Sequence, residues 1–286
     1  MNELTEEVVR SFDGAPQRLK TVTQALVRHL HAFIDEVRLT EAEWTYAIDF
    51  LTRTGHITDD KRQEFILLSD VLGASMATIK VNHPAGGTVT ESTVFGPFYL
   101  PDTPKFANGD DISQGAHGQP CFLSGVIRDE DGDPVPHAAI EVWQADEDGF
   151  YDVQYADLDR AQGRGRLVAE QDGRYWFWTV HPEAYPIPTD GPVGELLTAT
   201  GRHPMRPAHV HFRVAAPGFD TLTTHVFTSD SEYLDSDAVF GVKRSLIADF
   251  RRHEPSELTP DGRTVDVPYY TATFDIVLAR QLHRPS

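Results

Sequence analysis

Two histidines, His209 and His211, lie one residue apart in the apolar stretch RPAHVHFRV. Successive side chains of a β-strand point to opposite faces, so residues at positions i and i+2 share a face. Both imidazoles therefore project to one side of a strand, and Val210 between them takes the other side. This spacing fits half of a metal site, and it also fits a pair of core histidines bonded to backbone or water.

Three further side chains are candidates for chemistry if the histidines hold a metal. Tyr151 follows a predicted strand in the polar turn DEDGFYDVQ, and Tyr185 lies in the segment HPEAYPIPTDGP. The prolines of that segment fix φ and stiffen the loop, so a ligand there is held at low entropic cost. Taken alone, each tyrosine also fits a rim aromatic with its hydroxyl in water, and Arg206 fits an ordinary surface charge.

Composition excludes several classes of protein. The chain has 286 residues and a formal net charge of −19 at pH 7, and such an acidic chain repels phosphate backbones, so we expect no nucleic-acid partner. Its single cysteine, Cys121, excludes an internal disulfide framework and a thiolate metal cluster. No run approaches the ~18 apolar residues of a membrane helix, and the N-terminus MNELTEEVVR has no apolar signal core. We expect a soluble, cytoplasmic protein that is not a membrane protein.

Helical periodicity dominates the N-terminal part of the chain. Between Leu19 and Val37, apolar residues recur at steps of three and four, which predicts one apolar face of a long helix. Thr40 and Glu43 have the spacing of a capping box, which predicts the start of the next helix. A further helix is expected at 59–79. These helices are too few to close a large core alone, so we expect them to pack on the rest of the chain or on a second subunit.

After HPAGGTVT the period of the sequence changes. Short segments rich in β-branched and aromatic residues, such as CFLSGVIRD, RYWFWTV and LTTHVFTS, are separated by turn signals such as EDGDP and APGFD. Many short strands with such turns predict an antiparallel sandwich or barrel, and a helix at 236–250 is expected to interrupt it. The predicted fold class is therefore α+β, with an N-terminal helical region followed by an antiparallel β-sandwich.

Several long segments resemble the intradiol ring-cleavage dioxygenases. They are ESTVFGPFY, GFYDVQ, GRYWFWTVHPEAYPIPTDGPVGELL, GRHPMRPAHVHFRVAAPGFDTLTTHVF and YLDSDAVFGVKRSLI. The resemblance covers nearly the whole chain, and PIPTDGPVG and YLDSDAVFGVK are most similar to the branch that acts on hydroxyquinol. It implies that residues 1–99 are a helical linker and dimerisation region, and that residues 100–286 are a β-sandwich catalytic domain with a non-haem iron site.

The resemblance implies one mononuclear, non-haem ferric iron per subunit, with the ligands Tyr151, Tyr185, His209 and His211. The donor set suits the ion, since ferric iron is a hard cation, phenolate is a hard anionic donor, and two neutral imidazoles complete the shell. A phenol with a pKa near ~10 loses its proton when a metal takes its oxygen. The resemblance also makes Tyr185 the catalytic tyrosine that accepts a substrate proton, and makes Arg206 the catalytic cation that stabilises developing charge.

The resemblance further implies that a small aromatic diol and O2 are the substrates. The expected pocket is an apolar slot with few polar groups, and its wall consists of Leu67, Asp70, Val94, Phe95, Gly96, Pro97, Phe98, Ile187, Pro188 and Arg206. Without the resemblance, Leu67 and the VFGPF residues fit an ordinary core. Asp70 is the residue expected to select hydroxyquinol, because a carboxylate can accept a hydrogen bond from the third ring hydroxyl.

One position departs from the catechol branch, in which a glutamine usually follows LTT. Here the residue is His225, which strand alternation places on one face with Phe227, so it is not predicted to be a ligand. The expected reaction is cleavage of hydroxyquinol to 3-hydroxy-cis,cis-muconate, which tautomerises to maleylacetate.

Two other functions stay open. One is the same chemistry on catechol or a chlorocatechol. The other is a non-catalytic, metal-bearing β-sandwich, which the single cysteine disfavours because structural zinc sites commonly use thiolates. The apolar helical stripes predict a homodimer, the commonest kind of oligomer, and the resemblance implies a phospholipid bound between helices at its interface.

Overall fold

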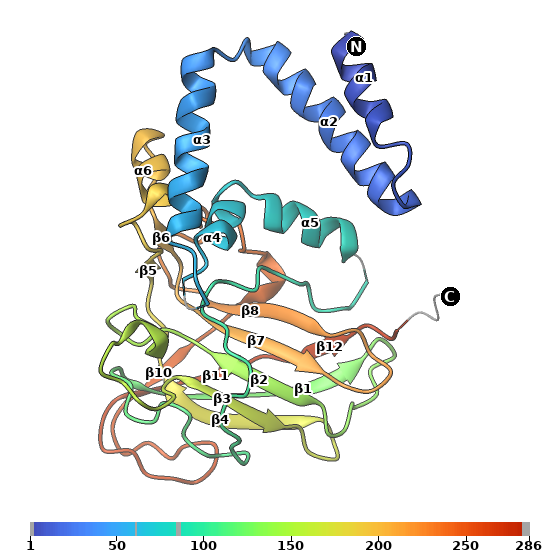
Figure 1. Cartoon of the computed structure of the whole chain (residues 1–286). Helices are drawn as coiled ribbons and strands as arrows, with labels where there is room; N and C mark the ends of the chain where they lie inside the picture. Colours follow the sequence, from blue (N-terminus) through green and yellow to red (C-terminus); the bar gives the residue numbers. More distant parts are fainter. Residues whose placement is uncertain (1–2, 61, 84–86, 282–286) are drawn as a thin grey trace. The chain divides into compact units, whose positions relative to one another are not determined.

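The structure is a computed structural model that describes residues 3–60, 62–83 and 87–281. They divide into two compact units, of which the first ends at His56 and the second begins at Ile57 (Figure 1). The regular elements described in the first unit are all helices, and the second unit contains the described strands. The predicted α+β class, with helices preceding a β-sandwich, is confirmed.

The first unit contains the helices α1 (Glu3–Ser11), α2 (Gln17–Val37) and α3 (Glu41–His56). The predicted capping box begins α3, because Thr40 N donates to Glu43 Oε2 at 2.8 Å and Glu43 N donates to Thr40 Oγ1 at 3.3 Å. The predicted apolar face of α2 is exposed along its length, and its residues are Leu19, Val22, Leu26, Leu30, Phe33 and Val37. An apolar stripe of this length on a surface is typical of a contact with protein or lipid.

Two helices, α4 (Glu64–Val71) and α5 (Ala74–Asn82), occupy the stretch where the sequence predicts one helix at 59–79. The helix stops because Gly73 adopts a left-handed backbone with φ +70°, a conformation that glycine takes without steric cost. Both helices belong to the same compact unit as the strands. The functional division into residues 1–99 and 100–286 stays a prediction.

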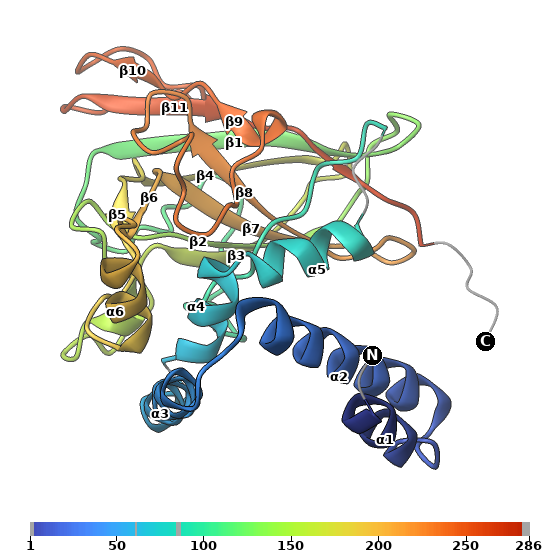
Figure 2. The same ribbon diagram turned by 90° about the horizontal axis from the view of Figure 1, so that it is seen from above.

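The strands form a sandwich whose two layers are clear in Figure 2. One sheet has the order β10-β11-β1-β12 with β4 paired to β1, the second has the order β3-β2-β7-β8-β9, and β5 pairs with β6. The bounds are β1 (Pro120–Asp129), β2 (Ala139–Trp143), β3 (Arg164–Val168), β4 (Arg174–Val180), β5 (Tyr185–Pro186), β6 (Met205–Arg206), β7 (His209–Ala215), β8 (Leu222–Thr228), β9 (Ile247–Ala248), β10 (Arg251–His253), β11 (Tyr269–Thr273) and β12 (Ile276–Leu278).

The pairing is mixed, whereas the sequence predicts a purely antiparallel sandwich. Strand β1 runs parallel to β11 and β12, and β8 runs parallel to β9. Parallel neighbours require a long return connection, and the C-terminal part of the chain supplies one by coming back along the full length of β1. The two layers of the sandwich are the same in either case.

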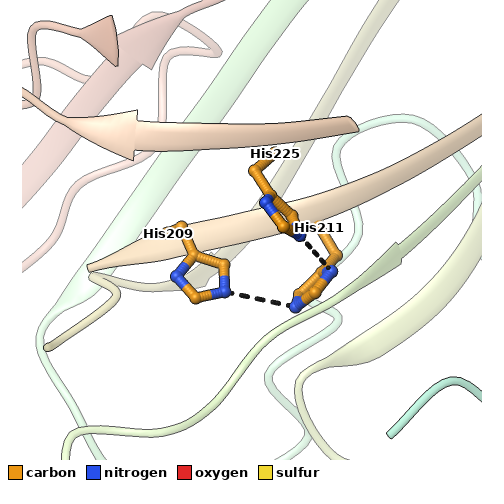
Figure 3. A group of neighbouring side chains, drawn as sticks. All are labelled: His209, His211 and His225. Carbon is orange, nitrogen blue, oxygen red and sulfur yellow. Dashed lines mark hydrogen bonds between the residues drawn. The ribbon is translucent and has the colours of Figure 1, made fainter. Parts of the chain in front are cut away.

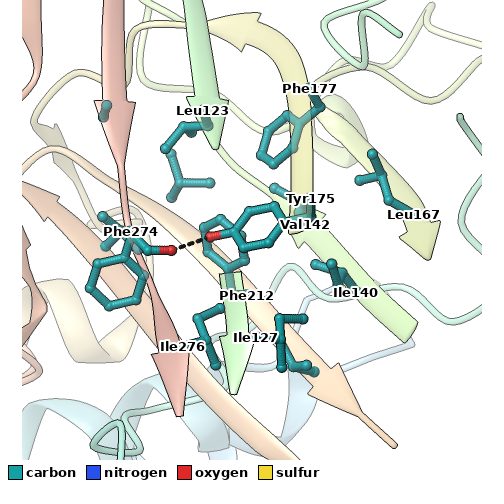
Figure 4. Packing of buried hydrophobic residues seen from close by; sticks show 14 of the residues in the cluster. Leu123, Ile127, Ile140, Val142, Leu167, Tyr175, Phe177, Phe212, Phe274 and Ile276 are labelled. Atoms are coloured by element: carbon teal, nitrogen blue, oxygen red, sulfur yellow. Dashed lines mark hydrogen bonds between the residues drawn. The ribbon is translucent and has the colours of Figure 1, made fainter. Parts of the chain in front are cut away.

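Alternation along β7 decides what faces the core. Val210, Phe212 and Val214 are fully buried between the sheets, where they pack in one apolar cluster with residues such as Ile140, Phe177 and Ile276 (Figure 4). Burying each such side chain stabilises the fold by about 1.5–3 kcal/mol relative to exposure. The same alternation sends His209 and His211 to the opposite face of the sheet, as the sequence predicts.

The predicted helix at 236–250 is wrong. This stretch contains turns, the 3-10 helix η2 (Arg244–Leu246) and β9. The Asp237 carboxylate accepts hydrogen bonds from the backbone N–H groups of Val239 and Gly241, and Phe240 has a positive φ of 60°, so a helix cannot continue. The sequence analysis also missed α6 (Pro192–Ala199), whose signal is a proline at the first helical position. Among the helices that the structure describes, none combines the length and the apolar character needed to cross a bilayer.

Candidate metal centre

Four buried side chains meet on the face of β7 that points away from the core. His209 and His211 come from β7 itself. Tyr185 comes from β5, which pairs with β6 at the end of the stiff proline loop, and Tyr151 directly precedes the 3-10 helix η1 (Asp152–Gln154). Each is at most 4% exposed. The structure therefore brings together all four residues that the sequence analysis expects to hold a metal.

Their polar atoms form a closed ring. Tyr151 Oη lies 2.9 Å from Tyr185 Oη and 3.0 Å from His211 Nε2. His209 Nε2 lies 3.2 Å from His211 Nε2 and 3.5 Å from Tyr185 Oη. Two oxygens and two nitrogens thus face one another in a space closed to solvent. This is a donor set for a single hard cation with some affinity for imidazole.

Hydrogen bonding fixes how His209 presents its ring. Its Nδ1 lies 2.6 Å from the carbonyl oxygen of Pro207, which can only accept. Its Nε2 lies 3.0 Å from Nη1 of Arg206, which can only donate. The proton of the neutral ring is therefore on Nδ1, which leaves Nε2, 3.2 Å from His211 Nε2, as the atom that can accept a hydrogen bond or bind a metal. A metal ligand needs this tautomer.

The electrostatics of the site fit a bound cation. Burial lowers the pKa of His209 and of His211 well below the ordinary value, so both imidazoles are neutral. Burial, together with the neighbouring Tyr185, raises the pKa of Tyr151 well above 10. Burial also raises the pKa of Tyr185, and Arg206 opposes that rise. Two tyrosinates at this place would need a strong positive charge beside them, which a bound metal ion would supply.

Arg206 is buried at the edge of the donor ring and is held by an acid that the sequence analysis missed. Its Nε donates to Asp237 Oδ1 at 3.2 Å and its Nη2 to Oδ2 at 3.5 Å. Both side chains are almost fully buried. A buried arginine requires such a partner, but nothing in the sequence says which of the 44 acidic residues it is.

A second buried ion pair supports Tyr151. Arg164 Nε donates to Asp152 Oδ2 at 2.7 Å, and both terminal nitrogens of the guanidinium donate to the Phe98 carbonyl oxygen at 3.2 Å. The Phe98 ring in turn stacks on Tyr151 with centroids 4.5 Å apart. On the other side of the site, Trp143 stacks on His211 with centroids 4.7 Å apart. The sequence analysis found neither Arg164 nor Trp143.

His225 contacts His211 and lies outside the ring of donor atoms, and a dashed line joins it to His211 in Figure 3. Its Nε2 is 2.8 Å from His211 Nδ1, and its Nδ1 is 2.8 Å from Thr93 Oγ1. The ligand atoms of His209, His211 and His225 lie within 4.8 Å of one another, so a three-imidazole site is also a geometric option. That option leaves both tyrosine hydroxyls unused.

A cavity of about 520 Å³ opens beside the site. Five of the predicted pocket residues line it, namely Leu67, Pro97, Phe98, Ile187 and Pro188. Its wall also contains polar residues that the sequence analysis missed, including Arg62, Glu64 and Asp190. Arg62 Nη1 and Nη2 each donate to Asp190 at 2.8 Å. This ion pair joins the segment before α4 to the segment before α6 in the wall of the cavity.

The other predicted pocket residues lie deeper or to one side. Val94 is buried in one apolar cluster with Leu67 and Ile187. Gly96 has φ +77°, so a side chain there would be strained, and its Cβ would crowd the His211 ring at 3.2 Å from Cε1. Phe95 is partly exposed and lies against Trp143 with centroids 5.8 Å apart.

Asp70 is 2% exposed and lies on the buried face of α4. Burial raises its pKa to about 6, while a hydrogen bond with Ser75 and the charge of Arg206 oppose the rise. At neutral pH the carboxyl group is therefore mostly ionised and can accept hydrogen bonds. Asp70 is not among the residues that line the cavity, but its charge interacts with that of Arg206.

Comparisons with known proteins cover nearly the whole chain. A family model described as the N terminus of catechol dioxygenase matches residues 16–89, and a model described as dioxygenase matches residues 94–280. The hydroxyquinol 1,2-dioxygenase of Nocardioides simplex is 58% identical over 278 residues, which are 97% of this chain and 94% of that protein. The 6-chlorohydroxyquinol 1,2-dioxygenase of Cupriavidus pinatubonensis is 57% identical over 97% of this chain and 96% of that protein. The solved structure of the hydroxyquinol 1,2-dioxygenase from Pseudomonas putida DLL-E4 superposes with a TM-score of 0.88 at 44% identity, covering 97% of this chain and 98% of that one.

Proposed function

The chain belongs to the intradiol ring-cleavage dioxygenases, and we propose that it cleaves hydroxyquinol, 1,2,4-trihydroxybenzene, between its two adjacent hydroxylated carbons. Both atoms of O2 enter the product, 3-hydroxy-cis,cis-muconate, which tautomerises to maleylacetate. The observation that carries the proposal is the buried ring of two tyrosine oxygens and two histidine nitrogens beside a buried arginine. Because the family consists of enzymes, the alternative of a non-catalytic β-sandwich is set aside.

The metal in this proposal is one ferric iron per subunit, held by Tyr151, Tyr185, His209 and His211. Supporting it is the chemistry of the donors, since two phenolate oxygens match a hard, highly charged cation better than they match zinc. When bound, ferric iron supplies a Lewis acid that draws electron density from a diol and makes its ring reactive toward O2.

The residues around the metal position accept a proton from the substrate and stabilise the charge that develops on its ring. In its phenolate form, Tyr185 accepts the proton of one substrate hydroxyl at Oη. Arg206 keeps a fixed positive charge beside the reacting ring, because the carboxylate of Asp237 anchors two of its nitrogens and no reorganisation is needed as charge develops. Tyr151 stays in place, since Phe98 stacks on its ring and Arg164 holds the turn that carries it.

The substrate is bound by the residues at the cavity and the metal centre, which are Leu67, Asp70, Val94, Phe95, Gly96, Pro97, Phe98, Ile187, Pro188 and Arg206. Supporting this assignment, five of them line the cavity and the apolar members exclude water from the reacting ring. Besides Arg206, Asp70 is the polar member of the set, and its carboxylate suits the third hydroxyl of hydroxyquinol.

Substitution of Asp70 by alanine is expected to reduce kcat/KM for hydroxyquinol much more than kcat/KM for catechol. The variant removes a charge-assisted hydrogen bond that costs about 1.5–3 kcal/mol to lose, or roughly ten- to a hundredfold in relative kcat/KM. Steady-state oxygen uptake on both substrates measures it. The matched control is Ser75→Ala, which removes a partner of Asp70 but leaves the carboxylate, and which should keep the preference. Equal losses on both substrates in Asp70→Ala would assign Asp70 to structure.

We also propose a cytoplasmic homodimer whose interface uses the apolar faces of α2 and α3, with a phospholipid bound between helices there. Supporting this, the six apolar residues of the α2 stripe are each at least 46% exposed, and Trp44, Ile48 and Leu51 of α3 are exposed as well.

Light scattering on the purified protein is expected to give twice the chain mass of 31.9 kDa. Replacing Leu26 and Leu30 of the α2 stripe by glutamate is expected to shift the mass toward that of one chain, because two charges cannot be buried unpaired in such an interface. Phosphorus analysis of an organic extract tests the lipid. A parent protein that runs as a 31.9 kDa monomer at working concentration would refute the dimer.

A further inference from the structure

His225 stands directly opposite His211 in the β7–β8 pair. The two rings are perpendicular, at 89°, with centroids 4.2 Å apart, and His225 is fully buried. The contact joins Nε2 of His225 to Nδ1 of His211 at 2.8 Å and is the dashed line between these two rings in Figure 3. On its other side, His225 Nδ1 lies 2.8 Å from Thr93 Oγ1. The three side chains therefore form one buried line of hydrogen bonds.

The protons of this line can be assigned once His211 binds a metal through Nε2. A neutral imidazole carries one proton, which must then be on His211 Nδ1 and be donated to His225 Nε2. His225 in turn carries its own proton on Nδ1 and donates it to Thr93 Oγ1. Every polar atom of both rings is used, and each ring is held in one tautomer and one orientation.

We propose that His225 is a positioning residue for the metal ligand His211. It holds the His211 ring at the angle that aims Nε2 at Tyr151 and His209, and its acceptor lone pair makes His211 the stronger donor to the metal. Thr93 fixes His225 in the required tautomer and directly precedes the pocket segment that begins at Val94. The line thus connects the metal centre with the wall of the substrate pocket.

The alternative role for His225 is that of a third imidazole ligand, and that role requires an ion placed away from the tyrosine oxygens. The two nitrogens of an imidazole point in divergent directions. Tyr151 and His209 lie against Nε2 of His211, while His225 lies against its Nδ1. A single ion on the tyrosine side of His211 is therefore out of reach of His225, which acts through His211.

The inference rests on the proposed iron site, and iron affinity is the measurement that tests it. The full-length protein is loaded with ferric iron, and its dissociation constant is measured by competition with a chelator, together with the visible phenolate-to-metal absorption. His225→Leu removes the acceptor and is expected to bind iron about 10- to 100-fold more weakly, as loss of an outer partner of a ligand commonly does. His225→Gln is expected to stay near the parent, because a carboxamide oxygen can accept from His211 while its NH2 donates to Thr93.

The matched control is Tyr175→Phe, which deletes another buried hydrogen bond, from Tyr175 Oη to the Phe274 carbonyl at 2.6 Å, in the core between the sheets (Figure 4). It should lower the melting temperature without changing iron affinity. If His225 had only a structural role, His225→Leu would likewise lower the melting temperature without changing iron affinity.

Four outcomes decide the matter. Iron affinity of His225→Leu equal to that of the parent overturns the proposal. Loss of iron in His225→Gln as complete as in His209→Ala identifies His225 as a ligand and overturns it as well. If His225→Leu does not fold, Thr93→Val is the deciding variant, because it leaves both imidazoles in place. Iron affinity of Thr93→Val equal to that of the parent would then contradict the proposal. A parent that binds no iron defeats the proposed function itself, which is a separate result.

Discussion

Tyr151→Phe and His209→Ala are each expected to abolish iron binding, visible colour and ring cleavage together. Two tyrosinates on ferric iron give a phenolate-to-metal charge-transfer band, so the parent protein should be reddish. Phenylalanine keeps the packing of Phe98 on residue 151 but removes the oxygen that lies 2.9 Å from Tyr185 and 3.0 Å from His211. Alanine at residue 209 removes Nε2, which lies 3.2 Å from His211 Nε2 and 3.0 Å from Arg206 Nη1. Metal analysis, absorption spectra and oxygen uptake measure the three losses.

The control for these variants is Tyr155→Phe. Tyr155 lies four residues from Tyr151 in the same turn region, and its hydroxyl donates to Asp146 at 2.6 Å rather than to the donor ring. Its loss should leave iron and colour unchanged. Full activity and colour in both Tyr151→Phe and His209→Ala would remove the proposed ligand set.

Arg206→Leu is expected to lower kcat by about 10²- to 10³-fold while iron stays bound, because a fixed cation beside developing negative charge contributes on this scale. Arg206 contacts His209 without being a ligand itself, so the visible band should persist. The variant also leaves the Asp237 carboxylate buried without its partner, which costs about 3–5 kcal/mol of stability.

The double variant Arg206→Leu/Asp237→Leu separates these two effects. Removing both charges avoids the unpaired carboxylate, so most of the lost stability should return, as measured by thermal unfolding of the iron-loaded protein. Activity should stay low, because the cation is still absent. Recovery of kcat along with stability would mean that Arg206 acts only through folding.

Local rules predicted the parts of the site that lie close together in sequence. The alternation of β7 placed His209 and His211 on one face, and the capping box of Thr40 and Glu43 placed the start of α3. The tyrosines needed the resemblance to a family, because a tyrosine in a polar turn has the same local pattern whether or not it binds a metal.

The supporting contacts could not be predicted because they join distant parts of the chain. Asp237 reaches Arg206 across 31 residues, Arg164 reaches the Phe98 carbonyl across 66, and Thr93 reaches His225 across 132. Sequence periodicity carries no information about such pairs. The same limit applies to the wrong helix at 236–250, where the hydrogen bonds of Asp237 to its own loop override helical propensity.

The most direct test of the proposed function is oxygen uptake by the iron-replete protein with hydroxyquinol, catechol and a chlorocatechol measured side by side. The proposal predicts that kcat/KM is highest for hydroxyquinol, that oxygen and substrate are consumed in equal amounts, and that maleylacetate accumulates. A higher kcat/KM for catechol or chlorocatechol, or no oxygen uptake with any of the three, would contradict it.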